Sequence, residues 1–346
     1  MTELIHRLAA EHTLSEREYE YLIVNRTPEA AEILADLARS AREPIYGHTV
    51  YIRGLIEISN ICKNDCLYCG IRRSNRACPR YRLTAEEILA CCAEGYRFGF
   101  RSFVLQGGED GAFTDEWLQG LLRRIKQAFP DCAVTLSLGE RSWESYQRLY
   151  EAGADRYLLR HETGDPIHYA LLHPKEMSYQ NRMACLHALK ETGYQVGCGF
   201  MVGSPGQTAA HLAKDLKFIE SFQPHMCGIG PFIPQHQTPF GREKAGPVEL
   251  TCYLLSMIRL IKPNILLPAT TALGTLDPHG REKGILAGAN VVMPNLSPAA
   301  VRKKYTLYDS KASDGAESAQ CVEALKAQMA AIGHRVVIGR GDMKTI

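Results

Sequence analysis

The sequence predicts an α/β protein built as a (β/α)8 barrel of the TIM type, preceded by a helical extension and followed by a helical tail. Short apolar runs alternate with amphipathic segments eight times between residues 50 and 310, which is the order of elements in a closed barrel of parallel strands. The amphipathic segments begin at capping residues and several end at glycine, as helices do. With 346 residues, of which 45% are hydrophobic, the chain is long enough to fill the core of such a barrel.

The N-terminal extension comprises residues 1–49 and is predicted to be helical. One helix is expected over residues 13–24, where a threonine or serine can cap its start. A second helix is expected over residues 27–41, because Pro28 stands in its first turn and apolar residues recur at helical spacing.

The barrel comprises residues 50–310 and is predicted to contain eight strands. They are expected over residues 50–59, 102–106, 133–138, 156–161, 195–202, 226–232, 265–270 and 290–294. The helices between them are expected over residues 85–98, 115–129, 143–152, 179–192, 209–222, 248–261 and 281–287. The N-caps expected for four of these helices are Thr84, Thr114, Ser142 and Ser178. The carboxyl ends of the strands should therefore meet at one face, where barrel enzymes place their active sites.

The C-terminal tail comprises residues 311–346. One more helix is predicted over residues 317–332. The chain from residue 339 onward is predicted to fray, as chain ends often do.

The overall charge and hydropathy argue against several classes of protein. A formal net charge of +2 provides no long-range field for nucleic acid or for an anionic membrane. No apolar run approaches the roughly 18 residues that a membrane span needs, and the first residues carry charges where a signal peptide would be apolar. Twelve cysteines at irregular spacing in a chain of this length do not indicate a disulfide framework. We therefore expect a cytoplasmic protein whose partners include neither nucleic acid nor a membrane.

Three closely spaced cysteines lie in the stretch 58–70, ISNICKNDCLYCG. Cys62, Cys66 and Cys69 have the spacing C-x3-C-x2-C, which suits three corners of a [4Fe–4S] cluster and leaves the fourth iron open to a small molecule. A zinc site would need a fourth Cys or His at comparable spacing, and none follows before Cys78. The motif therefore favours an iron–sulfur cluster over a zinc knuckle or an ordinary loop.

This spacing, with Tyr68 before the last cysteine, resembles the signature of the radical S-adenosylmethionine (SAM) superfamily. The resemblance implies that the open iron binds the amino and carboxylate groups of SAM, and that an electron from the reduced cluster releases a 5′-deoxyadenosyl radical. The next predicted strand ends in Gln106, Gly107, Gly108, Glu109 and Asp110. Glycines there allow close approach of the backbone, and the run resembles the GGE motif of the same superfamily, which binds the SAM ammonium.

Charged residues stand at the end of the fourth predicted strand, in the run RHET over residues 160–163. Charges at this place need partners or a polar ligand, and a rim of structural ion pairs is the alternative explanation. Arg182 lies on the next predicted helix, and its guanidinium is suited to binding a carboxylate.

Longer motifs extend the resemblance from the superfamily to one family within it. RHET, MVGSPGQT, GIGPFIP, PATTA and VVMPN follow the two motifs above in that order, and together they resemble the HydE family, the radical SAM maturases of [FeFe]-hydrogenase. The similarity covers residues 50–308. It implies a SAM-dependent step in assembling the diiron part of the H-cluster, acting on an iron carbonyl cyanide–cysteine complex. The implied partners are other hydrogenase maturases and a low-potential electron donor of the ferredoxin or flavodoxin type.

The resemblance also implies roles for individual residues. Those implied to hold the cluster are Cys62, Cys66 and Cys69. Those implied to contact SAM are Tyr68, Gly107, Gly108, Glu109, Glu162, Arg182, Met293 and Tyr305. Those implied to line the anion- or substrate-binding end of the cavity are Gln106, Thr135, Arg160, Thr270 and Thr271. An arginine and several hydroxyl groups suit a small anionic complex, and a closed barrel shields a carbon radical from solvent.

The chain departs from the family pattern near its C-terminus. Many members carry a second cysteine motif there for an accessory cluster, whereas the corresponding stretch, SKASDGAESAQC, keeps only Cys321. One thiolate cannot hold a cluster, so we expect a single [4Fe–4S] cluster. The cysteines outside the motif are predicted to be mostly small buried hydrophobic residues.

Three other functions remain open. A biotin-synthase-like enzyme would need a second cluster held by cysteines facing into the barrel, whereas the matching positions are Thr135 and Gly197, and Cys198 points to the other face of its strand. A mutase similar to methylornithine synthase would differ by few pocket side chains. An iron–sulfur scaffold that never cleaves SAM would need no methionine pocket, so the GGE run, Glu162 and Arg182 argue against it.

Overall fold

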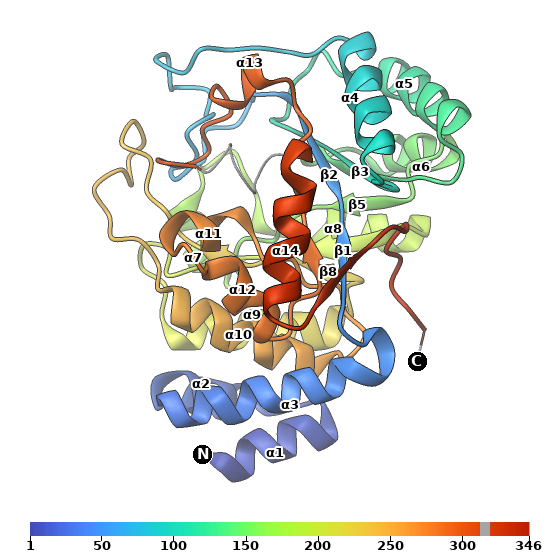
Figure 1. Cartoon of the computed structure of the whole chain (residues 1–346). Helices are drawn as coiled ribbons and strands as arrows, with labels where there is room; N and C mark the ends of the chain where they lie inside the picture. Colours follow the sequence, from blue (N-terminus) through green and yellow to red (C-terminus); the bar gives the residue numbers. More distant parts are fainter. Residues whose placement is uncertain (312–318, 346) are drawn as a thin grey trace.

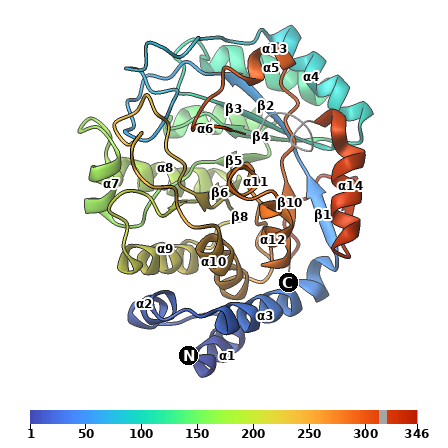
Figure 2. The same ribbon diagram turned by 60° about the vertical axis from the view of Figure 1, so that its left-hand side comes forward.

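The computed structural model describes residues 1–311 and 319–345. The N-terminal extension forms three helices, α1 (Thr2–Glu11), α2 (Glu16–Val24) and α3 (Pro28–Tyr46). Figures 1 and 2 show them as a layer outside the barrel helices α9 (Ala209–Phe222) and α10 (Val248–Ile261). Buried apolar residues such as Leu34 of α3 join this layer to the main core. The two helices predicted here are confirmed, and α1 is additional.

Parallel strands form a closed ring inside the molecule. The strands are β1 (Thr49–Ile52), β2 (Gly54–Ser59), β3 (Ser102–Gly107), β4 (Ala133–Ser137), β5 (Arg156–Leu158), β6 (Gln195–Cys198), β7 (Met201–Val202), β8 (Met226–Cys227), β9 (Gly230–Pro231) and β10 (Val291–Val292). Hydrogen-bonded ladders join six of these strands in the order β2-β3-β4-β5-β6-β8. Residues 265–268 continue the ring, because Leu266 bridges to β8 and Pro268 bridges to β10. A bridge between Leu55 and Asn295 closes it, so the predicted (β/α)8 barrel is confirmed.

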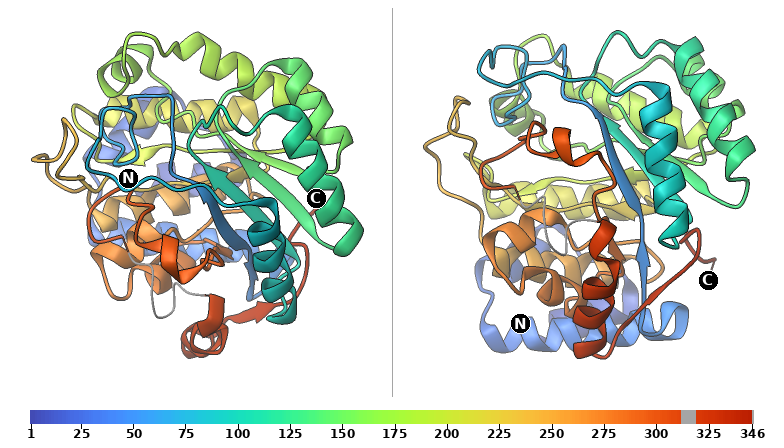
Figure 3. Two further views of the ribbon diagram at one scale, coloured as in Figure 1. Left: turned by 90° about the horizontal axis from the view of Figure 1, so that it is seen from above. Right: turned by 45° about the horizontal axis from the view of Figure 1, so that its top comes forward.

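Helices surround this ring, as the view from above in Figure 3 shows. Besides α9 and α10 they are α4 (Ala85–Arg97), α5 (Asp115–Ala128), α6 (Trp143–Glu151), α7 (Pro166–Leu172), α8 (Tyr179–Thr192), α11 (Thr271–Leu276), α12 (Gly280–Leu286), α13 (Ala299–Arg302) and α14 (Val322–Ala331). The four predicted N-caps are confirmed, since each side chain accepts a hydrogen bond from the third residue of its helix. At the end of α8, Gly193 adopts a φ of +103°, a conformation that favours glycine.

Several predicted strands differ in the structure. The strand expected over 50–59 is divided at Arg53, because β1 pairs with β10 whereas β2 pairs with β3. The strand expected over 265–270 forms only single bridges, and the chain is helical from Thr271. The fourth strand ends at Leu158, and the short helix α7 after it was not predicted, although its start carries an Asp cap and a proline.

Residues 339–345, the described part of the segment that was predicted to fray, pack against the barrel instead. Strand β11 (Arg335–Val337) pairs in parallel with β1, and Figure 3 shows the two running together. The residues that follow, 338–345, form what we call the floor segment. In it Asp342 pairs with Arg156 of β5, and the carbonyl of Gly341 accepts a hydrogen bond from Arg53 at 3.2 Å. The floor segment therefore covers the amino-terminal end of the barrel.

Two further observations concern the tail and the helices. The predicted helix over 317–332 corresponds to α14, preceded by a 3-10 turn over Ala319–Cys321, and its first two predicted residues lie outside the described part of the chain. Among the described residues no helix combines the length and the apolar character that crossing a bilayer requires.

Candidate active site

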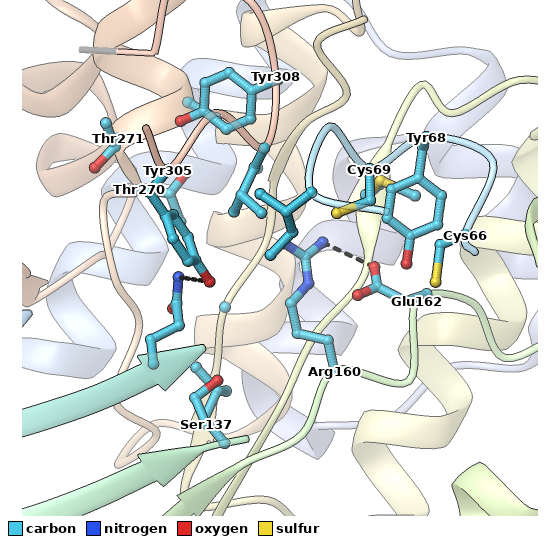
Figure 4. Close-up of a pocket in the computed structure, with 18 of the residues that line it drawn as sticks. Cys66, Tyr68, Cys69, Ser137, Arg160, Glu162, Thr270, Thr271, Tyr305 and Tyr308 are labelled. Carbon is cyan, nitrogen blue, oxygen red and sulfur yellow. Dashed lines mark hydrogen bonds and ion pairs between the residues drawn. The ribbon is translucent and has the colours of Figure 1, made fainter. Parts of the chain in front are cut away.

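A cavity of about 360 Å³ opens among the carboxyl ends of the strands. Every predicted site residue except Thr135 lines it. Thr135 instead faces a separate small cavity near Arg156, towards the floor segment. Ser137, two residues further along β4, takes its place in the wall (Figure 4). The prediction for Thr135 is therefore wrong, because side chains on the same face of a strand reach different depths of the barrel.

The three motif cysteines lie on the irregular segment between β2 and α4 and line the cavity together. The Sγ of Cys62 accepts a hydrogen bond from the backbone N–H of Glu109 at 3.4 Å, and the Sγ of Cys66 lies 3.6 Å from the Sδ of Met177. Burial raises the pKa of all three thiols, that of Cys69 to about 12. The neighbouring thiols raise the pKa of Cys66 further. The sulfurs are thus close enough to oppose one another's ionisation, and a bound metal would supply the positive charge that thiolates need.

Residues at the end of β3 contact the segment that carries the three cysteines. A Cβ atom at Gly108 would lie only 2.3 Å from the carbonyl oxygen of Ile61, so only glycine fits there. The carboxylate of Glu109 forms an ion pair with Lys63 at 3.0 Å and accepts the backbone N–H of Glu140 at 3.0 Å. The carboxylate of Glu109 is therefore already paired within the protein. The backbone of residues 107–109 lies beside the cavity.

The segment that follows β5 places two opposite charges in the wall of the cavity. Arg160 and Glu162 form an ion pair at 3.2 Å between Nη2 and Oε2 (Figure 4). No hydrogen bond satisfies the buried Nε and Nη2 of Arg160 or the buried Oε2 of Glu162. Glu162 also has a φ of +66°, which is rare and costly for a residue with a side chain. Unsatisfied charged groups and a strained backbone at one place are typical of a binding site.

A buried hydrogen-bond network supports this strained position from behind. Burial lowers the pKa of His161 to about 3, so its imidazole is neutral. Its Nδ1 accepts the backbone N–H of Gly199 at 3.3 Å, which leaves Nε2 to donate to Asp215 at 3.1 Å. The backbone N–H of Glu162 in turn donates to the carbonyl of Gly199 at 3.0 Å. The network fixes the direction of the Glu162 side chain.

Arg182 lines the same side of the cavity but already has protein partners. Its Nε donates to Glu140 at 2.6 Å, and its Nη1 donates to the backbone carbonyl of Arg160. Its guanidinium also lies over the ring of Tyr169, with 5.9 Å between the Cζ atom and the ring centre. Arg182 therefore holds the backbone of Arg160 in place. Only the face of the Arg182 guanidinium that points away from Tyr169 can contact a ligand.

The opposite side of the cavity is formed by the last strand positions and the segment after β10. The Nε2 of Gln106 donates to the hydroxyl of Tyr305 at 3.4 Å, and the hydroxyl of Thr270 donates to the carbonyl of Ile229 at 3.2 Å. Figure 4 shows Tyr305, Thr270 and Thr271 on this side, across from Cys66 and Cys69.

Sequence reasoning missed several residues of the cavity. Glu57 of β2 is fully buried and forms an ion pair with Lys311, while Asn295 donates to its second oxygen at 2.9 Å. A glutamate inside the apolar run GLIEIS was the signal that could have revealed it. His173 does not line the cavity itself, but its Nε2 lies 3.1 Å from the hydroxyl of Tyr68, which does.

The donor set fits a [4Fe–4S] cluster with SAM beside it. Within residues 1–311 and 319–345 no three His, Cys, Asp or Glu side chains are arranged to hold one metal ion. A cubane cluster does not require three ligands around one metal ion, because each thiolate binds a separate iron. Three thiols and no fourth cysteine line the cavity, and the unsatisfied atoms of Arg160 and Glu162 lie in the same wall. A zwitterionic ligand next to the cysteines would satisfy them.

Comparisons with known proteins agree with this donor set. The family model of the radical SAM superfamily matches residues 56–219. The [FeFe] hydrogenase maturase subunit HydE of Thermotoga maritima is 43% identical over 304 residues, which cover 88% of this chain and 86% of that protein. The 3-methylornithine synthase of Methanosarcina acetivorans is 30% identical over 81% of this chain and 79% of its own length.

A solved structure supports the fold. The crystal structure of methylornithine synthase (PylB) superimposes with a TM-score of 0.83 and covers 96% of this chain and 97% of its own, at 24% identity. This likeness concerns the fold, whereas the 43% identity to HydE over 88% of this chain shows the family. The chain therefore belongs to the radical SAM superfamily and, within it, to the HydE family of [FeFe]-hydrogenase maturases.

Proposed function

We propose that this enzyme reductively cleaves SAM at a single [4Fe–4S] cluster and acts on a small anionic iron complex during assembly of the diiron part of the [FeFe]-hydrogenase H-cluster. One observation carries the proposal. Arg160 and Glu162 place an ion pair in a cavity that three cysteines also line, and the buried Nε and Nη2 of Arg160 and Oε2 of Glu162 lack a hydrogen bond. Such atoms are costly unless a ligand pairs with them.

The residues on the cysteine side would hold the cluster and SAM. Cys62, Cys66 and Cys69 would bind three irons, and the free iron would take the amino and carboxylate groups of SAM. Glu162 supplies a carboxylate for the N–H groups of that amino group, and Arg182 presents the remaining face of its guanidinium to the SAM carboxylate. Together, the bound cluster and SAM would supply a 5′-deoxyadenosyl radical. Tyr68, held against His173, and the backbone of the run 107–109 would complete the methionine pocket.

The residues on the opposite side would bind the substrate. Gln106, Thr270 and Thr271 offer neutral polar groups, and Tyr305 offers a buried hydroxyl. Arg160 lies between the two sides and is the cation that a small anion would meet (Figure 4). An iron carbonyl cyanide complex with a bound cysteine has the size and the negative charge for this cavity.

The partners follow from the same proposal. The relative HydE is a hydrogenase maturase subunit, so we expect other maturases to supply the substrate and to receive the product. The cluster needs one electron for each cleavage of SAM, which a ferredoxin or flavodoxin would provide.

The test compares Arg160→Leu with wild-type protein carrying the reconstituted cluster. Both are assayed for 5′-deoxyadenosine formation and for activation of an apo-hydrogenase in the presence of the other maturases. Without the cation the substrate should bind weakly, so we expect matured hydrogenase per 5′-deoxyadenosine formed to fall at least tenfold, which corresponds to about 1.4 kcal/mol of lost binding.

Arg124→Leu is the matched control, because Arg124 forms an exposed ion pair with Glu86 far from the cavity. It should leave the ratio unchanged. A normal ratio in Arg160→Leu would contradict the anion pocket. Conversion of lysine or of dethiobiotin by the wild-type enzyme would replace the proposed reaction with that of a methylornithine synthase or a biotin synthase.

A further inference from the structure

Arg80 lies at the base of the cysteine segment and binds its backbone at four places. Its Nη1 donates to the carbonyls of Asn60 and Ile71 at 2.5 and 2.8 Å. Its Nη2 donates to the carbonyls of Arg72 and Asn75 at 2.6 and 3.0 Å. The first of these carbonyls precedes the three cysteines in the chain and the other three follow them. One guanidinium therefore joins the two arms of the segment that carries all three thiols.

The charge of Arg80 is not compensated by a carboxylate. Its neighbours Arg72 and Arg82 pair with Asp65 and Asp110, each at 2.7 Å. Within the described residues Arg80 forms no such pair, and its four hydrogen bonds go to neutral carbonyl groups. Carbonyl oxygens satisfy the N–H groups but leave the full positive charge in place.

This charge lies close to the two ends of the cysteine motif. Two of the carbonyls that Arg80 binds belong to Asn60 and Ile71, which are two positions from Cys62 and Cys69 in the chain. A cation that favours thiolates also favours a negatively charged cluster bound to them, and most of all its reduced form.

We propose that Arg80 is a positioning residue that holds the two arms of the cysteine segment together and, through its uncompensated charge, raises the reduction potential of the bound cluster. The inference rests on the proposed cluster but on no particular substrate. Reduction adds an electron close to the guanidinium, so removing the charge should make the cluster harder to reduce.

The experiment measures the midpoint potential of the reconstituted cluster by redox titration monitored by electron paramagnetic resonance, without substrate. The variants are Arg80→Gln, which removes the charge, and Arg80→Lys, which keeps it but cannot reach four carbonyls. The control is the double variant Asp65→Asn/Arg72→Gln, which disturbs the same segment by removing a neutral pair. We expect a shift to more negative potential in Arg80→Gln that is clearly larger than in Arg80→Lys or in the control.

Equal shifts in Arg80→Gln and in the control would overturn the inference, because loosening of the segment would then explain both. If Arg80→Gln binds no iron, the Arg80→Lys variant provides the test. Full iron content and a wild-type potential in Arg80→Lys would support the role of the charge. Loss of iron in Arg80→Lys as well would overturn the inference. Wild-type protein that takes up no cluster would refute the proposed function itself, so the two failures can be told apart.

Discussion

At the scale of single residues, Glu162 combines a strained backbone with a buried carboxylate oxygen, Oε2, that pairs with Arg160 but has no hydrogen bond. Its φ of +66° costs about 1–3 kcal/mol in a residue other than glycine. The hydrogen bond from its N–H to Gly199 and the buried contact between His161 and Asp215 maintain that conformation. This cost is consistent with the proposed role of the Glu162 side chain in binding SAM.

Replacing Glu162 by glycine separates the strain from the charge. Glycine tolerates positive φ but loses about 0.5–1 kcal/mol through its flexibility in the unfolded chain. We therefore expect the free energy of unfolding of Glu162→Gly to stay within about 1 kcal/mol of wild type. The dissociation constant for SAM, measured by calorimetry on the cluster-loaded protein, should rise at least tenfold, because a charge-assisted contact is worth roughly 1.5–3 kcal/mol.

Glu162→Gln is the comparison, since it keeps the strain and removes only the charge. It should also lose SAM affinity but should be no more stable than wild type. If Glu162→Gly retained normal SAM affinity, the carboxylate would serve the ion pair with Arg160 instead of the ligand.

At the scale of elements, the floor segment explains why Arg156 can be buried. Arg156 is 3% exposed and donates to the carbonyl of Arg340 at 2.8 Å and to the carboxylate of Asp342. Arg340 in turn pairs with Asp155 at 2.9 Å. Buried cations persist only with partners, so the end of the chain is part of the barrel.

The ion pair of Asp342 predicts a loss of stability in acid. Burial raises the pKa of Asp342, but the charges of Arg156 and Arg340 outweigh it and lower the value to about 2 from 3.8. A lowered carboxyl pKa stabilises the fold at pH values above that of the unfolded chain and ceases to do so as the pH falls. We expect this contribution to disappear between about pH 4 and pH 2, as followed by denaturant unfolding.

The same contact can be removed by mutation. Asp342→Asn leaves Arg156 without its carboxylate and should lower the free energy of unfolding by roughly 1–3 kcal/mol near pH 7, less than for a fully buried pair because Asp342 is 37% exposed. The pH dependence between 4 and 2 should shrink as well. Glu86→Gln, at an exposed ion pair, should change little, and an equal loss there would contradict the assignment.

Local signals in the sequence were sufficient for much of the fold. The N-caps Thr84 and Thr114 and the periodic helices they begin were predictable, because these features depend on neighbouring residues. Strand β11 and the floor segment were not, since pairing with β1 joins residues almost 300 positions apart. The same limit applies to the cavity: Glu162 could be placed from its motif, whereas the partner of Glu57, Lys311, lies 254 residues away in the sequence.

At the scale of the whole molecule, the cysteines divide into three groups. Seven of the twelve are buried as free thiols. Three line the cavity together, and Cys252 and Cys321 are partly exposed apart from them. Most of the stretch SKASDGAESAQC, residues 310–321, lies outside the described residues, so the number of clusters stays a prediction from the sequence.

That prediction can be tested by counting iron. The reconstituted protein should contain about four irons per chain, because only one group of cysteines can hold a cubane. Cys62→Ala should lose most of them, whereas Cys321→Ala should keep all of them, as measured by iron analysis and by absorption of the cluster. A content of roughly eight irons, or iron retained in Cys62→Ala, would contradict a single cluster.

The closed base of the barrel has a consequence for kinetics. Because the floor segment covers the amino-terminal end, ligands enter from the end where the cysteines and the SAM pocket lie. Gln106 and Arg160, proposed for the substrate, precede the proposed SAM residues Gly107 and Glu162 in the chain and so lie nearer the closed end. On the proposed function, the iron complex therefore binds deeper and arrives first, and SAM arrives second. We therefore expect a compulsory order of addition, with 5′-deoxyadenosine leaving before the converted iron complex, and product inhibition that is competitive with only one of the two reactants.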